Sequence, residues 1–242
     1  PVIHITGTNG KGSTTQIITQ LLIAHGLQVG TYTSPHLENL TERISRNNEP
    51  ISEQDFADCV AAIADIEVIG GVRPSYFEVM TAAAFRYFAD TAVDVAVIEV
   101  GMLGRWDATN VVNSSVAVIT NIALDHQEFA GPRLEDIAFE KVGSSKPGSV
   151  LVVGDTNEDL HEIWNAAEST AVLLRGNDFE ISENELAVGG RMIDVRTERA
   201  VYKDLPLPLH GQHQGENALI ALTAVEEFFG NVLDIEVVRE GL

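Results

Sequence analysis

The chain has 242 residues, 45% of them hydrophobic and 21% charged, which suits one large α/β domain with a buried core and excludes a disordered chain. Its formal net charge of −21, from 36 acidic and 15 basic residues, disfavours DNA and RNA as partners. No apolar run approaches the roughly 18 residues of a membrane span, and a single cysteine, Cys59, cannot form an internal disulfide. We therefore expect a cytoplasmic protein without membrane contact.

The first half of the chain predicts strands that alternate with helices. Its apolar runs are continuous, as in strands buried on both faces, and its helical segments repeat apolar residues at three- and four-residue spacing. In chain order we expect a strand over residues 2–6, a strand over 28–33, helices over 52–65 and 77–89, and strands over 93–100 and 116–122. This alternation predicts an α/β fold with a mostly parallel sheet flanked by helices.

The second half of the chain adds one more unit of alternating helix and strand, and its pattern then changes to short segments of alternating polar and apolar residues. A helix over residues 133–141, a strand over 150–153 and a helix over 158–168 continue the first pattern. Short alternating segments, divided by Gly189-Gly190, then predict a small antiparallel β excursion near residues 171–209. A closing helix is expected over residues 216–229.

The strongest motif is the glycine-rich stretch from Gly7 to Thr14, which lies between a predicted strand and a predicted helix. Glycines let the backbone wrap closely around phosphates, while backbone N–H groups, a helix N-terminus and Lys11 supply positive potential. The stretch departs from G-x-x-x-x-G-K-[ST], because Gly12 follows the lysine. We interpret it as a P-loop for an anionic nucleotide; the alternative is a plain turn with a solvated lysine.

Polar residues gather where three predicted strands end. Ser34 follows the second strand, Glu99 ends an apolar strand, and Asp125-His126 follow the next one. Carboxyl ends of parallel strands share one edge of a sheet, so these side chains are candidates for holding Mg²⁺. The alternatives are a turn serine, an exposed glutamate and a structural histidine. Lys141 ends a predicted helix, where the dipole favours a cation, and spacing alone gives it no further role.

Taken together, these segments resemble the folylpolyglutamate synthase/dihydrofolate synthase family of the Mur-ligase superfamily. In family order the matching segments are 4–13, Ser34-Pro35-His36-Leu37, Phe77-Glu78, Glu99-Val100-Gly101, 104–110, Leu124-Asp125-His126, Glu140-Lys141, His213-Gln214 and Asn217-Ala218. In that family ATP phosphorylates a folate or dihydropteroate carboxylate, and L-glutamate then attacks the acyl phosphate to form an amide.

The resemblance implies a role for each matching residue, with ATP and Mg²⁺ as cofactors. The phosphates would lie on Thr8, Asn9, Gly10, Lys11, Gly12 and Ser13, the base or ribose near Asn217, Mg²⁺ on Ser34, Glu99 and His126, and the pterin near Phe77, Asp107 and Asn110. Lys141 would be carbamylated by CO₂, so that Lys11, Lys141 and His126 are the candidate catalytic residues.

The resemblance also implies that residues 1–242 form the central ATP-binding domain and that the family's C-terminal glutamate-ligase domain is absent. Leu103 stands at a usual glycine, a position that can require a positive φ or close approach to a ligand. Val142-Gly143-Ser144 and Gln127 are further departures from the family pattern. Two other functions stay open, a degenerate non-catalytic ATP-binding homologue and a peptidoglycan-precursor ligase of the same superfamily.

Overall fold

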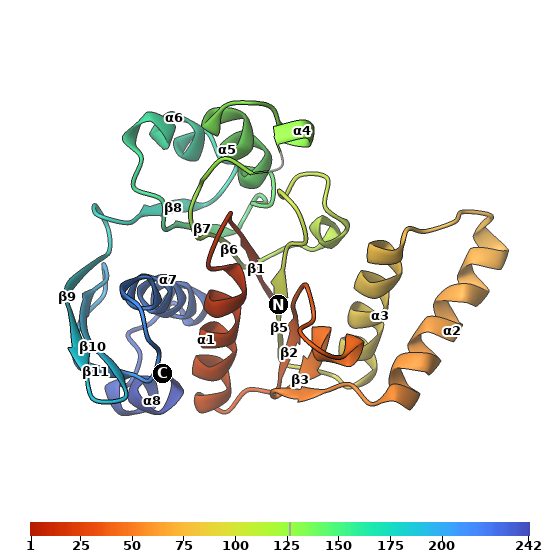
Figure 1. Cartoon of the computed structure of the whole chain (residues 1–242), viewed down its shortest axis with the longest axis horizontal. Coiled ribbons are helices and arrows are strands. Elements are labelled where there is room, and N and C mark those ends of the chain that lie inside the picture. Colours follow the sequence, from red (N-terminus) through yellow and green to blue (C-terminus); the bar gives the residue numbers. More distant parts are fainter. Residues whose placement is uncertain (126) are drawn as a thin grey trace.

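Eight strands form the main sheet of the structure, a computed structural model that describes residues 1–125 and 127–242 (Figure 1). Their order is β4-β3-β2-β5-β1-β6-β7-β8, and the run from β2 to β8 is parallel, while β3 and β4 pair antiparallel at one edge. The strands are β1 (Val2–Thr6), β2 (Val29–Tyr32), β3 (Ile44–Arg46), β4 (Glu49–Pro50), β5 (Val95–Glu99), β6 (Val116–Ile119), β7 (Val150–Val153) and β8 (Ala171–Leu174). The loops after the parallel strands therefore meet at one edge.

Both faces of this sheet are buried, as the continuous apolar runs predict. In β5, Val95 and Val97 belong to one core, whereas Ala96 and Ile98 belong to another on the opposite face. The first face is covered by α1 (Lys11–Ala24), α7 (Gln212–Phe229) and α8 (Ile235–Gly241). The other face carries α2 (Glu53–Gly70), α3 (Tyr76–Asp90), α5 (Leu134–Val142) and α6 (His161–Asn165). The predicted α/β fold with flanking helices is confirmed.

Helix boundaries follow local capping chemistry. The Ser52 hydroxyl accepts a hydrogen bond from Asp55 N at 3.0 Å and begins α2, and Ser75 with Glu78 forms a capping box at the start of α3. Gly71, with a φ of 66°, ends α2 five residues beyond the predicted end. The remaining short helices are η1 (Leu40–Arg43), η2 (Ala108–Val111), α4 (Gln127–Ala130) and η3 (Glu158–Leu160). Among the described residues, none of the helices combines the length and apolarity that crossing a bilayer requires.

A second, three-stranded antiparallel sheet lies beside α7 and α8, at the opposite end of the molecule from α2 and α3 (Figure 1). Its strands are β9 (Glu180–Ala187), β10 (Gly190–Arg196) and β11 (Val201–Leu207). The predicted excursion is thus present, but its expected start was wrong, because residues 171–174 form β8 of the main sheet. Leu173 and Leu174 are buried there, and this apolar pair suits a strand beside β7 better than a half-exposed hairpin.

The small sheet is attached to the start of α7. The Asn184 side chain on β9 donates a hydrogen bond from Nδ2 to Gln212 O at 3.0 Å. Gly215 on α7 packs so closely that an added Cβ would lie 2.5 Å from Asn184 Nδ2. Behind this contact, Ile193 and Val195 join the core formed by α1 and α7. The excursion is therefore an integral layer of the domain.

Candidate active site

The loop between β1 and α1 is held by the end of β6. Thr8 N donates to Asn121 O at 2.9 Å, and Asn9 N donates to the Asn121 side chain at 2.8 Å. The Thr120 hydroxyl donates to Asn9 O at 2.6 Å. These three bonds fix the backbone of the loop before any ligand arrives, which is the preorganisation that binding a phosphate requires.

Two glycines in this loop leave no room for a side chain in the present packing. Gly7 has a φ of 147°, and an added Cβ would lie 1.8 Å from Thr120 Oγ1. Gly10, with a φ of 81°, is the N-cap of α1, and its Cβ would lie 2.5 Å from Asn217 Oδ1. The glycine spacing of the motif thus comes from close packing against β6 and α7 as well as from backbone conformation.

Lys11 and Lys141 converge on a single carbonyl. Lys11 Nζ donates to Gly7 O at 3.1 Å and to Thr8 O at 3.3 Å, while Lys141 Nζ donates to Gly7 O at 2.8 Å. Lys141 is buried, and burial, followed by the nearby charge of Lys11, lowers its pKa to about 8. Two lysines beside Gly7 create a strong positive potential at the end of β1.

A buried carboxylate lies at the end of β5. Glu99 is 3% exposed and accepts a hydrogen bond from Ser34 N at 3.0 Å. Burial raises its pKa to about 7, against the opposing effects of the Ser34 bond and of Lys11. An added Cβ on Gly12 would lie 3.9 Å from Glu99 Oε2, so the carboxylate faces the first turn of α1.

These groups fit a divalent cation such as Mg²⁺. Glu99 supplies a hard oxygen ligand whose ionised form lacks sufficient compensation from the protein, and Ser34, whose backbone N–H donates to it, adds a hydroxyl oxygen to the same region. His126, the third predicted ligand, lies outside the described residues. Within residues 1–125 and 127–242 no cluster of three His, Cys, Asp or Glu side chains forms a site by itself. Glu99 and Ser34 therefore offer two of the predicted ligands.

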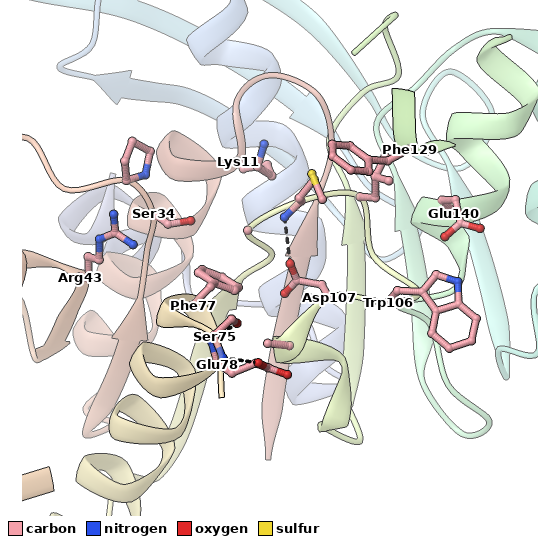
Figure 2. A pocket seen from close by; sticks show the side chains of 15 residues that line it. Lys11, Ser34, Arg43, Ser75, Phe77, Glu78, Trp106, Asp107, Phe129 and Glu140 are labelled. Carbon is pink, nitrogen blue, oxygen red and sulfur yellow. Dashed lines mark hydrogen bonds between the residues drawn. The ribbon is translucent and has the colours of Figure 1, made fainter. Parts of the chain in front are cut away.

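A cavity of about 860 Å³ opens beside the loop, at the edge where β1, β2 and β5 end (Figure 2). It is lined by residues that include Lys11, Ser34, Arg43, Phe77, Trp106 and Asp107. Phe77 packs against Gly101, where an added Cβ would lie 2.4 Å from the ring. The wall thus combines an aromatic face, a carboxylate and cations, a combination suited to a planar, polar ligand.

Asp107 is held firmly in this wall. Its Oδ2 accepts from Met102 N at 2.9 Å, and its Oδ1 accepts from Thr109 N at 2.9 Å and from the Thr109 hydroxyl at 2.6 Å. Because the Thr109 hydrogen is used in this way, His4 Nε2, 2.9 Å from the same hydroxyl, is the donor to it. Burial lowers the pKa of His4 to about 4, so the ring is neutral. These bonds fix the position of the Asp107 carboxylate in the cavity wall.

Two further residues were expected to bind ligands, Asn217 near the nucleotide and Asn110 near the pterin, and they lie in different places. Asn217 adjoins the loop, since its Oδ1 faces Gly10 and its Nδ2 donates to Gln214 Oε1 at 3.0 Å. Asn110 is not among the residues that line the cavity. Its Nδ2 donates to Arg105 O at 2.8 Å and to Gly143 O at 3.1 Å, which braces the loop after β5 against the end of α5.

Comparison with known proteins places this geometry in a family. Residues 5–225 match the family model described as the Mur ligase middle domain. The chain belongs to the Mur ligase family. It is 41% identical over 268 residues to a dihydrofolate synthase/folylpolyglutamate synthase of Mycobacterium tuberculosis, with 100% of this chain and 54% of that protein covered.

Solved structures agree with this placement of the Mur ligase domain. A Mycobacterium tuberculosis folylpolyglutamate synthase complexed with ADP matches it with a TM-score of 0.92 and 42% identity, over 100% of this chain and 57% of that one. An FPGS–AMPPCP–folate complex matches with a TM-score of 0.93 and 35% identity, over 100% and 62%. The chain thus spans somewhat more than half the length of these relatives.

Leu103 of this Mur ligase domain adopts the backbone conformation expected at a glycine position. Its φ is 57°, and its carbonyl accepts a hydrogen bond from the Thr6 hydroxyl. The side chain is 8% exposed. The protein therefore keeps the left-handed backbone despite a Cβ, at a cost of about 1 kcal/mol.

We expect Leu103→Gly to unfold with a free energy about 1 kcal/mol higher than Leu103→Ala, because both lose the leucine side chain but only alanine keeps the strain. Activity of the glycine variant should be unchanged or higher. Urea titration of the two variants measures the difference. Ala83→Gly in α3 is the control, and there glycine should be the less stable residue. A more stable alanine variant at position 103 would contradict the prediction.

Proposed function

We propose that the protein is the ATP-binding part of a ligase that adds L-glutamate to folate, to dihydropteroate or to both through an acyl phosphate, and that it acts in the cytoplasm. The supporting observation is the position of the Lys11 loop, Glu99 and the cavity lined by Phe77 and Asp107 at one sheet edge. The comparisons lend support, since the relatives are named for these reactions.

In the proposed reaction, the loop amides and Lys11 hold the ATP phosphates, and Phe77 and Asp107 hold the pterin. The Phe77 ring offers an aromatic face, and the fixed carboxylate of Asp107 accepts hydrogen bonds from ring N–H groups. Glu99, Ser34 and His126 would hold Mg²⁺, which neutralises charge on the transferred phosphoryl group when bound. Asn217 lies where α7 meets the loop, next to the expected nucleotide.

An ADP-release assay on the full-length gene product tests this function. Dihydropteroate and tetrahydrofolate are each supplied with ATP and Mg²⁺, with and without L-glutamate. ADP release that requires both the pterin compound and glutamate supports the proposal. Release that requires neither, or a measured ATP affinity without any product, supports the degenerate homologue, and titration calorimetry with ATP and Mg²⁺ separates these two outcomes.

Glu99 gives this site a dependence on pH. Its pKa in the folded protein, about 7, exceeds its ordinary value of 4.5, so the folded state binds the proton more tightly than the unfolded state. The stability from Glu99 is fully present below pH 4.5 and is lost as pH rises to about 7. Without Mg²⁺, we expect Glu99→Gln to gain on the order of 3 kcal/mol over the parent protein between pH 4.5 and 8.

Urea titrations at several pH values in Mg²⁺-free buffer measure this gain. The glutamine variant should also bind Mg²⁺-ATP more weakly, because an amide is a poor ligand for the cation. Glu140→Gln, at a partly exposed residue farther along the cavity wall, is the control. If the difference in unfolding free energy between Glu99→Gln and the parent protein does not change with pH, the prediction is wrong, and ionisation of Glu99 does not destabilise the folded state.

A further inference from the structure

Arg43 is a largely buried cation in the wall of the cavity. Its residue is 9% exposed, and it lies at the end of η1, where Arg43 O accepts a hydrogen bond from Thr33 N at 2.9 Å. Figure 2 places its side chain on the Ser34 side of the cavity, with Phe77 between it and Asp107. A fixed backbone and a confined side chain hold the guanidinium in one region of the site.

Among the described residues, the partners of this guanidinium are uncharged. Arg43 Nε donates to His36 Nδ1 at 2.9 Å, which requires an unprotonated acceptor nitrogen, and the Tyr76 ring centroid lies 5.7 Å from Arg43 Cζ. The adjacent carboxylate of Glu42 is already used, since its Oε2 accepts from Leu37 N at 2.9 Å. In the part of the chain that the structure describes, no carboxylate lies within 4 Å of the Arg43 guanidinium.

Most other arginines of this acidic chain have a carboxylate partner. Those paired within 4 Å are Arg73, Arg86, Arg105, Arg133, Arg175, Arg196, Arg199 and Arg239. Because the chain has 36 acidic and only 15 basic residues, carboxylates are abundant as partners for its arginines. Arg43 is a confined cation that faces a cavity and lacks a carboxylate partner among the described residues. Such a charge is costly to leave uncompensated, so the position suits an anionic group of the ligand.

The substrates of the proposed ligase differ by an anionic group of this kind. Dihydropteroate carries one carboxylate, which is the group that ATP activates. A folate ends in a glutamyl group with two carboxylates, so that one is activated and the other stays ionised through the reaction. The activated carboxylate must lie near Lys11, and the free one then needs a second cation in the same cavity.

We propose that Arg43 binds the free carboxylate of the terminal glutamyl group and thereby sets the preference for a folate over dihydropteroate. This inference rests on the proposed function. Arginine suits the task, because two parallel N–H donors match both oxygens of a carboxylate, whereas lysine offers a point charge. His36 occupies Nε and so leaves the Nη atoms for the ligand.

The test is the ratio of two dissociation constants in one protein, dihydropteroate over tetrahydrofolate, measured by titration calorimetry with the full-length gene product. We expect Arg43→Gln to weaken tetrahydrofolate binding about tenfold to a hundredfold, the loss typical of a charge-assisted hydrogen bond, and to leave dihydropteroate within about twofold. Arg43→Lys should show an intermediate ratio. Arg46→Gln is the control, since Arg46 Nη2 bonds Gln28 Oε1 and does not line the cavity.

Each outcome decides a separate point. Equal loss of both compounds would overturn the proposal and make Arg43 a structural residue. A rise only in the KM for L-glutamate would overturn it in favour of a site for the incoming amino acid. Unchanged ratios in a parent protein that binds both compounds would also overturn it, but would leave the proposed function intact. If the parent protein binds neither compound, both the inference and the proposed function fail.

Discussion

Lys11→Ala is expected to lower ADP release by the full-length gene product at least about a hundredfold, the scale typical of losing one preorganised charge-stabilising group. The Lys11 ammonium is held beside the loop by the carbonyls of Gly7 and Thr8, at 3.1 and 3.3 Å. Its stem starts at the first residue of α1, so the charge is already at the helix N-terminus, where phosphates bind. Little reorganisation is needed when ATP arrives.

Steady-state ADP release with saturating pterin compound and glutamate measures this loss, and a melting curve verifies folding. Lys203→Ala removes an exposed lysine of β11 and should keep the parent rate. A folded Lys11→Ala protein with the parent rate would show that the loop does not act on the phosphates.

Lys141→Ala is expected to reduce turnover on the same scale, and small carboxylates such as acetate should restore part of it. Only a neutral amine reacts with CO₂, and burial with the adjacent Lys11 charge lowers the Lys141 pKa to about 8, so the neutral form is substantially populated at mildly alkaline pH. A carbamate would turn a cation beside Gly7 into an anion able to order a metal shell.

The covalent state has a direct readout. With ¹³C-bicarbonate, a carbamate NMR signal should grow between pH 7 and 9 in the parent protein and be absent from Lys141→Ala. Lys146→Ala, at a lysine five residues along the chain, should keep the signal. If pH 9 gives no signal and acetate gives no recovery, Lys141 acts as an ordinary ammonium group.

Features that depend on local chemistry were the most predictable from the sequence. The glycine-rich loop, the start of α1 and the buried strands of the parallel sheet follow from residue spacing and apolar runs. The backbone at Leu103 followed from a family glycine, and its φ of 57° confirms that a left-handed conformation is needed there. In each case a short stretch of chain contains both the cause and the result.

Features that depend on distant contacts were not predictable. The Asn110 side chain is used by carbonyls of Arg105 and Gly143, the second of them 33 residues away, and no local pattern indicates this. No sequence pattern singles out Arg43 after the Ser34 segment, because its proposed role depends on the lack of a carboxylate partner among the described residues. Ala171–Leu174 joined the main sheet because β7 offered an open edge, which is a property of the assembled sheet.

The attachment of the small sheet to α7 gives the two ends of β9 a different tolerance to change. At its far end, Val188 and Gly189 form an exposed turn where an added Cβ on the glycine would meet nothing within 4 Å. That tip can lengthen, shorten or carry an insertion without reaching the loop between β1 and α1. Asn184, by contrast, sits against Gly215, two residues before Asn217 and its contact with Gly10. A larger side chain at this position would press on Gly215 and, through α7, on the Asn217 contact with the loop, so we expect insertions to be tolerated only in the outer half of the hairpin.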